Sequence, residues 1–372
     1  MVKHRWKLER GKIERVAVGG RPPLGIEGGP AARPEQRRKI LVLAFGNSAI
    51  QASTNWQALS WQDGFDLAMV GLNNDVHGPR CPVVRLPSGE RVTVTPGLLK
   101  VINVPDRRDA IRQHPLLERR YARLLANIPV WETYNMGGRG GHSIPQLSAM
   151  DIDLEIAAVT EHLRMGIHML TGGYILPPEA GDLAQAMLEQ AMAQQAEEER
   201  YLIVVLVGGS GSMGNASAQL LAYPLRYLLA EAGITNYELW GVILGPNAFR
   251  GLTQDTEHNY LALLHSLETL ARTGLTRQYI NGLEVAMRTP PYDQVLLLDE
   301  PNMPLKGGRV TEAGLEAFLE RAALSLHVTF GTGAYAAAAA RLANPLDGVA
   351  SLRDRKHRWL HTASGQMATV DV

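Results

Sequence analysis

Residues 201–215 constrain the fold of this 372-residue chain more than any other stretch. The run from Leu202 to Val207 is unbroken, apolar and rich in β-branched residues, which is typical of a central parallel strand covered on both faces. Glycines and small polar residues follow at once, and a helical pattern then opens at Ala216 and ends at Gly233. The stretch therefore predicts a strand, a glycine loop and a helix in direct succession.

This succession predicts an anion-binding loop. Glycines let the backbone approach an anion closely and turn its N–H groups towards it, while the helix dipole adds its positive end. A tight turn between strand and helix is the alternative, but four glycines and three small polar residues in eight positions favour a phosphate site. The candidate contacts are Gly208, Gly209, Ser210, Gly211, Ser212, Met213, Gly214 and Asn215.

The composition is that of an ordinary globular protein, with 45% hydrophobic residues, 20% charged residues and no net charge. No apolar run approaches the ~18 residues of a membrane span, so we expect no transmembrane segment. The single cysteine, Cys81, excludes an internal disulfide framework and fits a reducing compartment, which predicts a cytoplasmic location. Its position before Pro82 gives little support to a catalytic thiol.

Residues 1–38 are interpreted as a basic, flexible N-terminal arm. Residues 1–39 carry eleven Lys or Arg against four Asp or Glu, with a stretch rich in Gly and Pro in between. The apolar positions around Gly11 also allow a short hairpin. This charge balance would suit an anionic partner, either nucleic acid or acidic lipid, although a solvated tail is the interpretation that we favour.

The remaining chain alternates strands with helices, which predicts an α/β fold with a largely parallel sheet. We interpret Asp151, Asp153 and Glu155 as acids in a first helical turn that complement the helix dipole, rather than as metal ligands. The predicted strands are 39–46, 67–72, 202–207, 237–244 and 294–298, with a hairpin over 81–96. The predicted helices are 49–61, 106–128 with a break near Pro115, 151–170, 182–200, 216–233, 255–272 and 311–330.

Several loops follow the carboxyl ends of these strands, where ligands bind in open α/β sheets. Together they suggest a nucleotide held by many backbone contacts. The chain has no Walker A sequence and no GxSxG elbow, which excludes the ordinary P-loop NTPase and a nucleophile elbow at Ser210 or Ser212. The loops concerned are 45–50, 73–77, 208–215 and 299–302, with 136–145 as a further glycine-rich loop.

An NAD(P)-dependent oxidoreductase is the main alternative, because Gly209, Gly211 and Gly214 match the dinucleotide fingerprint GxGxxG. That fingerprint expects an acid at the end of the next strand, whereas residues 244–247 read Leu-Gly-Pro-Asn. The motif also lies beyond residue 200, behind other strands. A catalytically silent nucleotide-binding scaffold remains a third interpretation.

With its loops placed, the chain resembles the tubulin/FtsZ superfamily over about residues 39–330, and a divergent prokaryotic branch of it in particular. Residues 207–213 are similar to the family's GGGTGSG loop, which also lies between a strand and a helix. The order of the elements supports the resemblance as well. It implies a Rossmann-like GTPase domain with a long core helix, here 311–330.

The resemblance also implies a set of guanine-nucleotide contacts. Asn73, Asn74 and Asp75 look like the Asn-Thr-Asp loop after the second sheet strand of the family. Asn302 would contact the nucleoside and Phe318 would stack on the base. Further contacts implied by the resemblance are Gly46 and Asn47 in the first loop, Gly138, Arg139, Gly140 and Gly141 in the loop that senses the γ-phosphate, and Pro246.

The cofactor implied is GTP or GDP, with Mg²⁺ carried on the phosphates, and the partner implied is a second copy of the chain in head-to-tail self-association. In the family an acidic loop completes hydrolysis across the subunit contact, and Asp347 is the candidate catalytic residue here. Residues 331–372 are too few for the family's second domain. The chain departs from the family at Ala322–Ala323, where an acid or amide is expected, and at Pro224, which should kink the helix after the glycine loop. We therefore expect slow or absent GTPase activity and weak self-association.

Overall fold

The computed structural model describes residues 3–9, 12–18, 39–62, 67–78, 83–85, 89, 91–93, 98–135, 137–171, 201–252, 255–331 and 360–364. The chain divides into two units, Met1–Arg37 and Arg38–Val372. In the first unit, strand β1 (Lys3–Glu9) pairs antiparallel with β2 (Lys12–Val18). The short hairpin that the sequence allows around Gly11 is therefore present.

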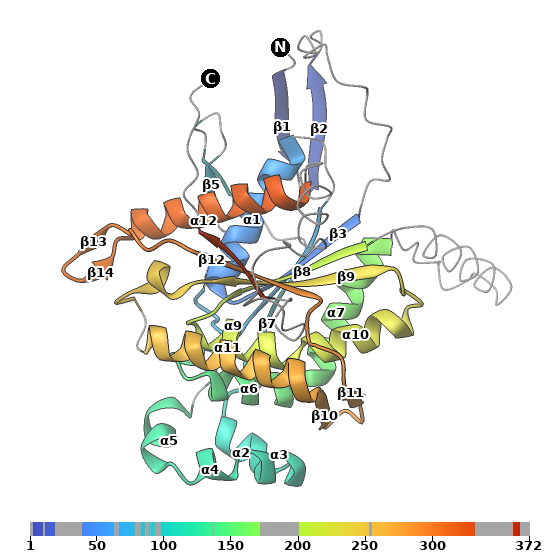
Figure 1. Ribbon diagram of the computed structural model, residues 1–372, viewed down its shortest axis with the longest axis vertical. Coiled ribbons are helices and arrows are strands. Elements are labelled where there is room, and N and C mark those ends of the chain that lie inside the picture. The colour runs from blue at the N-terminus through green and yellow to red at the C-terminus, as the bar shows by residue number, and fades with distance from the viewer. Residues whose placement is uncertain are drawn as a thin grey trace, which may run out of the picture. The chain divides into compact units, whose positions relative to one another are not determined.

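Seven strands form the central sheet of the second unit, in the order β15-β12-β9-β8-β3-β4-β7, and every neighbouring pair is parallel (Figure 1). All residues of β8 are buried, as its apolar sequence predicts. The predicted α/β fold with a parallel sheet is thus confirmed. The strands are β3 (Lys39–Phe45), β4 (Leu67–Asn73), β7 (Leu98–Val101), β8 (Tyr201–Gly208), β9 (Tyr237–Leu244), β12 (Gln294–Asp299) and β15 (Leu360–Ser364).

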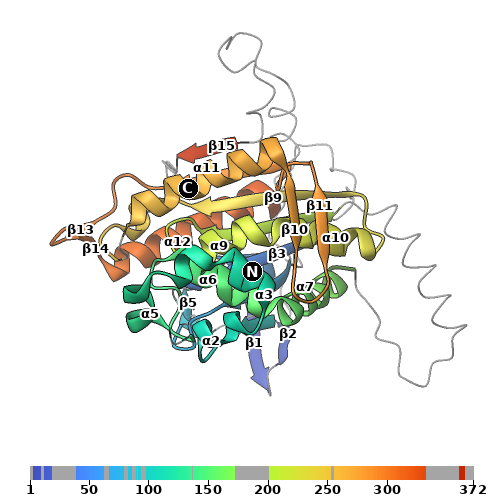
Figure 2. The same ribbon diagram turned by 90° about the horizontal axis from the view of Figure 1, so that it is seen from below.

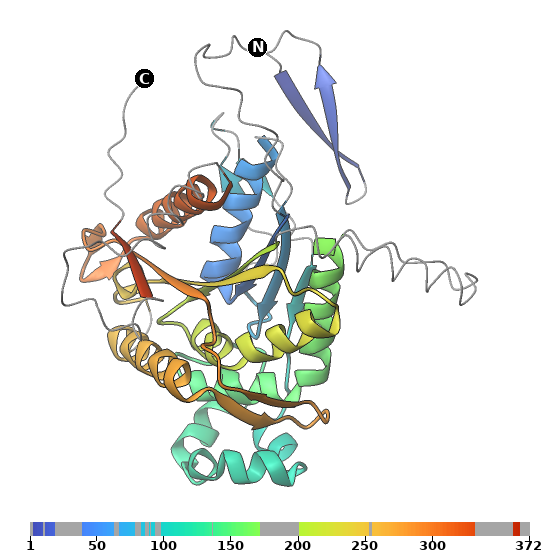
Figure 3. The ribbon, with the colours of Figure 1, turned by 45° about the vertical axis from the view of Figure 1, so that its right-hand side comes forward.

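Helices cover both faces of this sheet, because alternate strand residues point to opposite sides. Leu41 and Leu43 of β3 belong to one apolar core, while Ile40 and Val42 belong to the other. The second core is covered by α1 (Asn47–Gln62) and α12 (Glu312–Leu326), which continues into a π-helical turn, η2 (His327–Gly331). The first core is covered by α7 (Ile156–Thr171), α9 (Ser212–Leu220), α10 (Ala222–Glu231) and α11 (Thr256–Thr273), on the opposite side of the sheet (Figure 3).

The helix after the glycine loop is interrupted at Leu221, between α9 and α10, just before Pro224. Proline has no N–H to offer the carbonyl four residues earlier, which is that of Leu220. The Tyr279 hydroxyl donates a hydrogen bond of 3.1 Å to that carbonyl instead. The expected disruption at Pro224 is therefore present, and a neighbouring hairpin compensates for it.

A cluster of short helices follows β7 and packs on α6 through a separate apolar core (Figure 2). The predicted helix over 106–128 is thus divided not only near Pro115 but again at Tyr121. The predicted start of the following helix at Asp151 is wrong, because α6 begins at Pro145. The elements are α2 (Arg107–Arg112), α3 (Pro115–Arg120), α4 (Ala122–Leu125), α5 (Ile128–Tyr134) and α6 (Pro145–Leu154).

Small hairpins complete the described structure. The predicted hairpin over 81–96 contains β5 (Val83–Arg85) and β6 (Arg91–Thr93), which pair antiparallel. The hairpins β10 (Leu275–Gln278) with β11 (Glu284–Met287), and β13 (Leu305–Lys306) with β14 (Arg309–Val310), were not predicted. The predicted helix over 182–200 lies outside the described residues.

Candidate nucleotide-binding site

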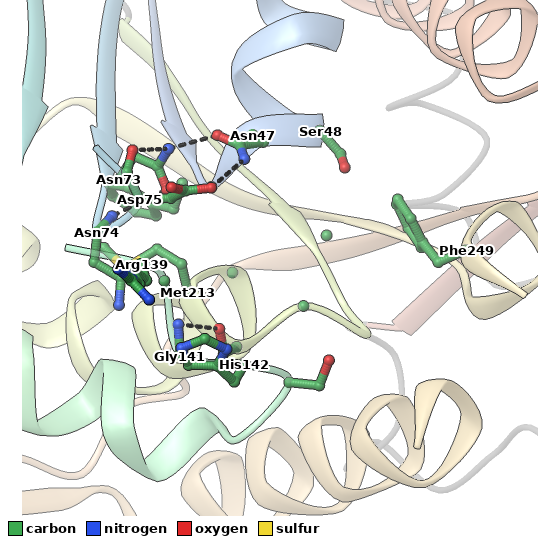
Figure 4. Close-up of a pocket in the computed structure, with 18 residues that line it drawn as sticks. Asn47, Ser48, Asn73, Asn74, Asp75, Arg139, Gly141, His142, Met213 and Phe249 are labelled. Carbon is green, nitrogen blue, oxygen red and sulfur yellow. Dashed lines mark hydrogen bonds between the residues drawn. The ribbon is translucent and has the colours of Figure 1, made fainter. Parts of the chain in front are cut away.

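A cavity of about 300 Å³ lies at the carboxyl edge of the sheet (Figure 4). Strands β3 and β8 are neighbours there, yet the helices that follow them, α1 and α9, cover opposite faces. This is the topological switch point at which open α/β sheets bind ligands. The cavity is lined by Phe45, Gly46, Asn47, Ser48, Asn73, Asn74, Asp75, Arg139, Gly140, Gly141, His142, Ser143, Gly208, Gly211, Ser212, Met213, Gly214 and Phe249.

The amino end of α9 forms one wall of this cavity. The helix begins at Ser212, so the predicted start at Ala216 is wrong and Gly214 and Asn215 lie within the first turn. Its N-cap residue is Gly211, which has no side chain to cap the helix. Because the first amides of a helix have no intrahelical acceptor, those of Ser212, Met213 and Gly214 are suited to bind an anion in the cavity.

The glycines of this loop have different structural roles. A Cβ at Gly209 would lie 2.6 Å from the Tyr260 ring and 2.7 Å from Ile243, and one at Gly214 would lie 2.5 Å from the Gly208 carbonyl oxygen. These two glycines therefore allow close packing behind the cavity. By contrast, a Cβ at Gly208 or Gly211 would meet no atom closer than 3.7 Å. Close approach of a ligand is thus a reason for glycine at Gly208 and Gly211, but not at Gly209.

The opposite wall comes from the ends of β3 and β4. The Asn73 side-chain amide donates to Asn47 Oδ1, and Asn47 Nδ2 donates to Asp75 Oδ2 at 3.4 Å. Asp75 Oδ1 accepts a further hydrogen bond of 2.9 Å from the His77 amide. This network orients the Asp75 carboxylate at the cavity, where the sequence places a nucleotide contact (Figure 4).

The loop 137–143 closes the cavity with an unusual backbone. Gly138 and Gly140 have φ of 76° and 70°, and the non-glycine residues His142 and Ser143 have φ of 47° and 62°. Such left-handed conformations are uncommon outside glycine and concentrate at functional sites. The Gly141 amide donates to Ser212 Oγ at 3.2 Å, so this loop directly contacts the first residue of α9.

A buried ion pair supports this loop from behind, and the sequence did not predict it. The Arg107 guanidinium donates two hydrogen bonds of 2.7 Å to the Asp151 carboxylate, with 0% and 1% of the side chains exposed. Arg107 also donates to the carbonyls of Tyr134 and Gly140, each at 2.9 Å. Asn74 Nδ2 donates to Asp151 Oδ2 at 2.8 Å, which links the end of β4 to this ion pair.

The dipole interpretation is therefore wrong for Asp151 and Asp153, whereas Glu155 directly precedes the amino end of α7. Asp151 and Asp153 lie in the later part of α6, whose first turn begins at Pro145. Asp153 accepts hydrogen bonds from Arg120 at 2.9 Å and from the Tyr121 hydroxyl at 2.7 Å, and it also pairs with Arg277. Among the described residues, no group of three or more His, Cys, Asp or Glu could hold a metal ion.

Asn259 of α11 is a second supporting residue that sequence reasoning missed. Its Nδ2 donates to the Ser143 carbonyl at 2.7 Å and to the Ser210 carbonyl at 3.3 Å, so one side chain joins the two glycine-rich loops. Asn215 Nδ2 in turn donates to the Asn259 carbonyl at 2.7 Å. An asparagine inside a polar helix carries no local sequence signal for this role.

His142 extends into the cavity from the strained part of the loop 137–143 (Figure 4). Its ring lies on Tyr134, with ring centres 4.6 Å apart and planes inclined by 32°. Burial and the nearby guanidinium groups of Arg107 and Arg139 lower the pKa of His142, and Asp75 opposes this shift. The imidazole is therefore neutral near pH 7. The sequence did not predict a role for this residue.

Some of the sequence-predicted contacts do not line the cavity. Gly138, Gly209, Ser210 and Asn215 are buried next to lining residues in the sequence but do not line the cavity themselves. Pro246 lies in the 3₁₀ turn η1 (Pro246–Phe249), which contributes Phe249 instead. Asn302 is exposed, and Phe318 is 4% exposed and belongs to the apolar core under α12. Asp347 lies outside the described residues, and the nucleotide-contact roles of all these residues stay predictions.

The comparisons with known proteins find similar chains among solved structures only. Neither a family model nor a curated protein matches the sequence. CetZ2 from Haloferax volcanii, solved as a GTPγS-bound protofilament, matches with a TM-score of 0.38 and 18% identity over 78% of this chain and 59% of that one. TubZ of Bacillus thuringiensis serovar israelensis, as a GTPγS-form protofilament, matches with a TM-score of 0.33 and 11% identity over 79% of this chain and 57% of that one.

The chain spans less than two thirds of the length of these structures. No helix in the described part of the chain has both the length and the apolar character needed to cross a membrane.

Proposed function

We propose that the chain is a tubulin-like guanine-nucleotide-binding protein whose nucleotide phosphates bind at the amino end of α9. The observation that carries this proposal is the helix end without a side-chain cap, where Ser212, Met213 and Gly214 line a cavity at the switch point of the sheet. Backbone amides at a helix end bind phosphate through directed hydrogen bonds and a favourable dipole. The absence of side chains at Gly208 and Gly211 leaves space for a phosphate group.

The charges of the cavity suit a nucleotide with a divalent cation. Arg139 lines the cavity and supplies a guanidinium group for the phosphates. Asp75 is the one carboxylate among the lining residues. Mg²⁺ commonly keeps several waters and is bound by phosphates with one or two carboxylates, so a single acid is sufficient. Asp75 would hold the ion beside the phosphates, where the ion neutralises their charge.

Guanine specificity and self-assembly rest on the family resemblance. Asn302 would recognise the purine edge, since an amide offers both a donor and an acceptor. A head-to-tail contact would cover the nucleotide, as the resemblance implies, and the cytoplasm is the compartment that suits such a protein. Residues 1–38 have no partner assigned by the comparisons.

Nucleotide competition tests this proposal directly. The chain is titrated into a fluorescent GTP analogue, and unlabelled GTP, GDP, ATP and NAD⁺ are added in turn. We expect displacement by GTP and GDP and none by NAD⁺. Equal displacement by ATP would contradict guanine specificity but not the phosphate site, whereas displacement by NAD⁺ alone would favour the oxidoreductase alternative. No binding of any nucleotide would refute the proposal.

Sedimentation tests self-association separately. The chain is sedimented with the non-hydrolysed analogue GTPγS and with GDP, over a series of protein concentrations. We expect a larger sedimenting fraction with GTPγS, because a terminal phosphate at an interface changes the contacts between subunits. Identical sedimentation in both nucleotides would contradict nucleotide-linked assembly while leaving nucleotide binding intact.

A further inference from the structure

We propose that His142 is a catalytic residue for GTP hydrolysis, acting on the attacking water within a single chain. This inference rests on the proposed function, because it requires GTP in the cavity. It differs from the expectation that a second subunit must complete the site. The side chain extends from the loop 137–143 into the cavity, and its ring packs on the Tyr134 ring.

The first argument is the position of His142 relative to the phosphate site. The preceding residue, Gly141, donates its amide to Ser212 Oγ at 3.2 Å, and Ser212 is the first residue of α9. A phosphate bound at that helix end therefore lies beside the Gly141–His142 segment. Arg139, three residues earlier, lines the same cavity and supplies the positive charge that a departing phosphoryl group needs.

The second argument is that the structure fixes the imidazole in place despite an unfavourable backbone. His142 has φ of 47° and Ser143 has φ of 62°, which is costly for residues other than glycine. The Tyr134 ring supports the imidazole from α5, and the Asn259 side chain holds the Ser143 carbonyl from α11. A loop that served only to connect α5 with α6 would not need this conformation at a histidine.

The third argument is the protonation state. The charged groups that influence His142 are Arg107, Arg139 and Asp75, and Tyr134 packs on its ring. Burial, and after it the two guanidinium groups, lower the pKa of the imidazole, against the weaker effect of Asp75. A neutral imidazole has a nitrogen lone pair that can accept a proton, and His is the most common general base in enzymes.

The proposed step balances as follows. The imidazole lone pair accepts a proton from water as the water oxygen forms a bond to the γ-phosphorus. The bond between the γ-phosphorus and the bridging oxygen breaks, and its electron pair stays on GDP. The imidazolium then returns the proton to the inorganic phosphate. No oxidant, reductant or further reactant is required, and the histidine is regenerated.

The test compares His142→Asn with the unmodified chain in single-turnover phosphate release from GTP. Asparagine tolerates a left-handed backbone but accepts no proton at neutral pH, so the loop keeps its shape. We expect turnover to fall about 100-fold or more, while the Kd for GTPγS stays unchanged. His265→Asn is the matched control, since His265 is exposed on α11 outside the cavity, and it should leave turnover unchanged.

Three further readouts distinguish a catalytic role from a structural one. In His142→Gly, added imidazole should restore turnover, because the left-handed backbone suits glycine and leaves space for the free base. The rate per chain should not depend on protein concentration. The rate of the unmodified chain should fall as the pH drops below the lowered pKa of His142. The His142→Asn variant should lack this fall. Protonation of the GTP phosphates affects both proteins equally, so it does not account for the difference.

The outcomes separate this inference from the proposed function. If the unmodified chain binds no nucleotide, the proposed function fails and this inference fails with it. If GTP binds but is not hydrolysed, or if turnover per chain rises with protein concentration, His142 is not the water-activating residue and only this inference fails. The same holds if His142→Asn loses GTPγS affinity rather than turnover, or if imidazole gives no rescue.

Discussion

Replacing Gly208 by alanine tests whether the end of β8 is open for a phosphate. An added Cβ would lie 3.7 Å and 4.0 Å from two atoms of the Phe249 ring, and 4.0 Å from the Ser48 Cβ. These are ordinary contact distances, and Gly208, Phe249 and Ser48 all line the cavity. The methyl group therefore enters cavity space without displacing the protein around it.

The expected magnitude follows from this geometry. The fold should be unaffected or stabilised by about 0.4–1 kcal/mol, since alanine restricts the unfolded chain more than glycine does. A phosphate displaced from the helix end loses one hydrogen bond or more to a charged group, each worth about 1.5–3 kcal/mol. The Kd for GTP should thus rise about 10- to 100-fold.

Isothermal titration with GTP and chemical denaturation of the ligand-free chain measure the two effects separately. Gly209→Ala is the informative comparison, because its Cβ would lie 2.6 Å from the Tyr260 ring and should lower the free energy of unfolding. Unchanged GTP affinity in Gly208→Ala, with an unchanged free energy of unfolding, would show that the phosphates do not approach this part of the loop.

Three further variants test residues that hold the loops of the cavity or that are predicted to contact the base. Asp151→Asn should lower the free energy of unfolding in urea by about 3–5 kcal/mol, because it leaves the buried Arg107 charge unpaired; a change below 1 kcal/mol would contradict this role. Asn259→Ala removes the donors to two loop carbonyls and should weaken GTP binding by about 1–3 kcal/mol in calorimetry, and equal affinities would mean that the loops keep their shape alone. Asn302→Ala should weaken GTP binding by a similar amount if the amide recognises guanine. An unchanged preference for GTP over ATP in this variant would mean that another residue recognises the base.

The order of strands and helices could be predicted because its signals are local. The apolar run 202–207 predicts a buried parallel strand, and the structure places it at the centre of the sheet. The loops at residues 46, 73 and 208 could be placed at one edge because the ends of parallel strands meet there. The positions of these loops follow from the direction of the strands and from the residue types that follow them, and both can be read from the sequence.

Element boundaries and supporting residues could not be predicted in the same way. The start of α6 was placed at Asp151 because the acids there imitate a first helical turn, although Pro145 at the first helical position is the correct signal. The Arg107–Asp151 pair joins residues 44 positions apart, so no local pattern indicates it. The reason for glycine at Gly209 depends on Tyr260, a residue that only the folded chain brings close.

The buried Arg107–Asp151 pair explains how a loop with four left-handed residues keeps one shape. Burying an ion pair is costly unless every polar atom is satisfied, and here Arg107 donates both to Asp151 and to the carbonyls of Tyr134 and Gly140. The pair thus satisfies the carbonyl of the last residue of α5 and the Gly140 carbonyl of the loop. A loop fixed in this way needs little ordering when a ligand binds, which lowers the entropic cost of binding. The strain at His142 is therefore offset within the ligand-free fold, as a site prepared for its ligand requires.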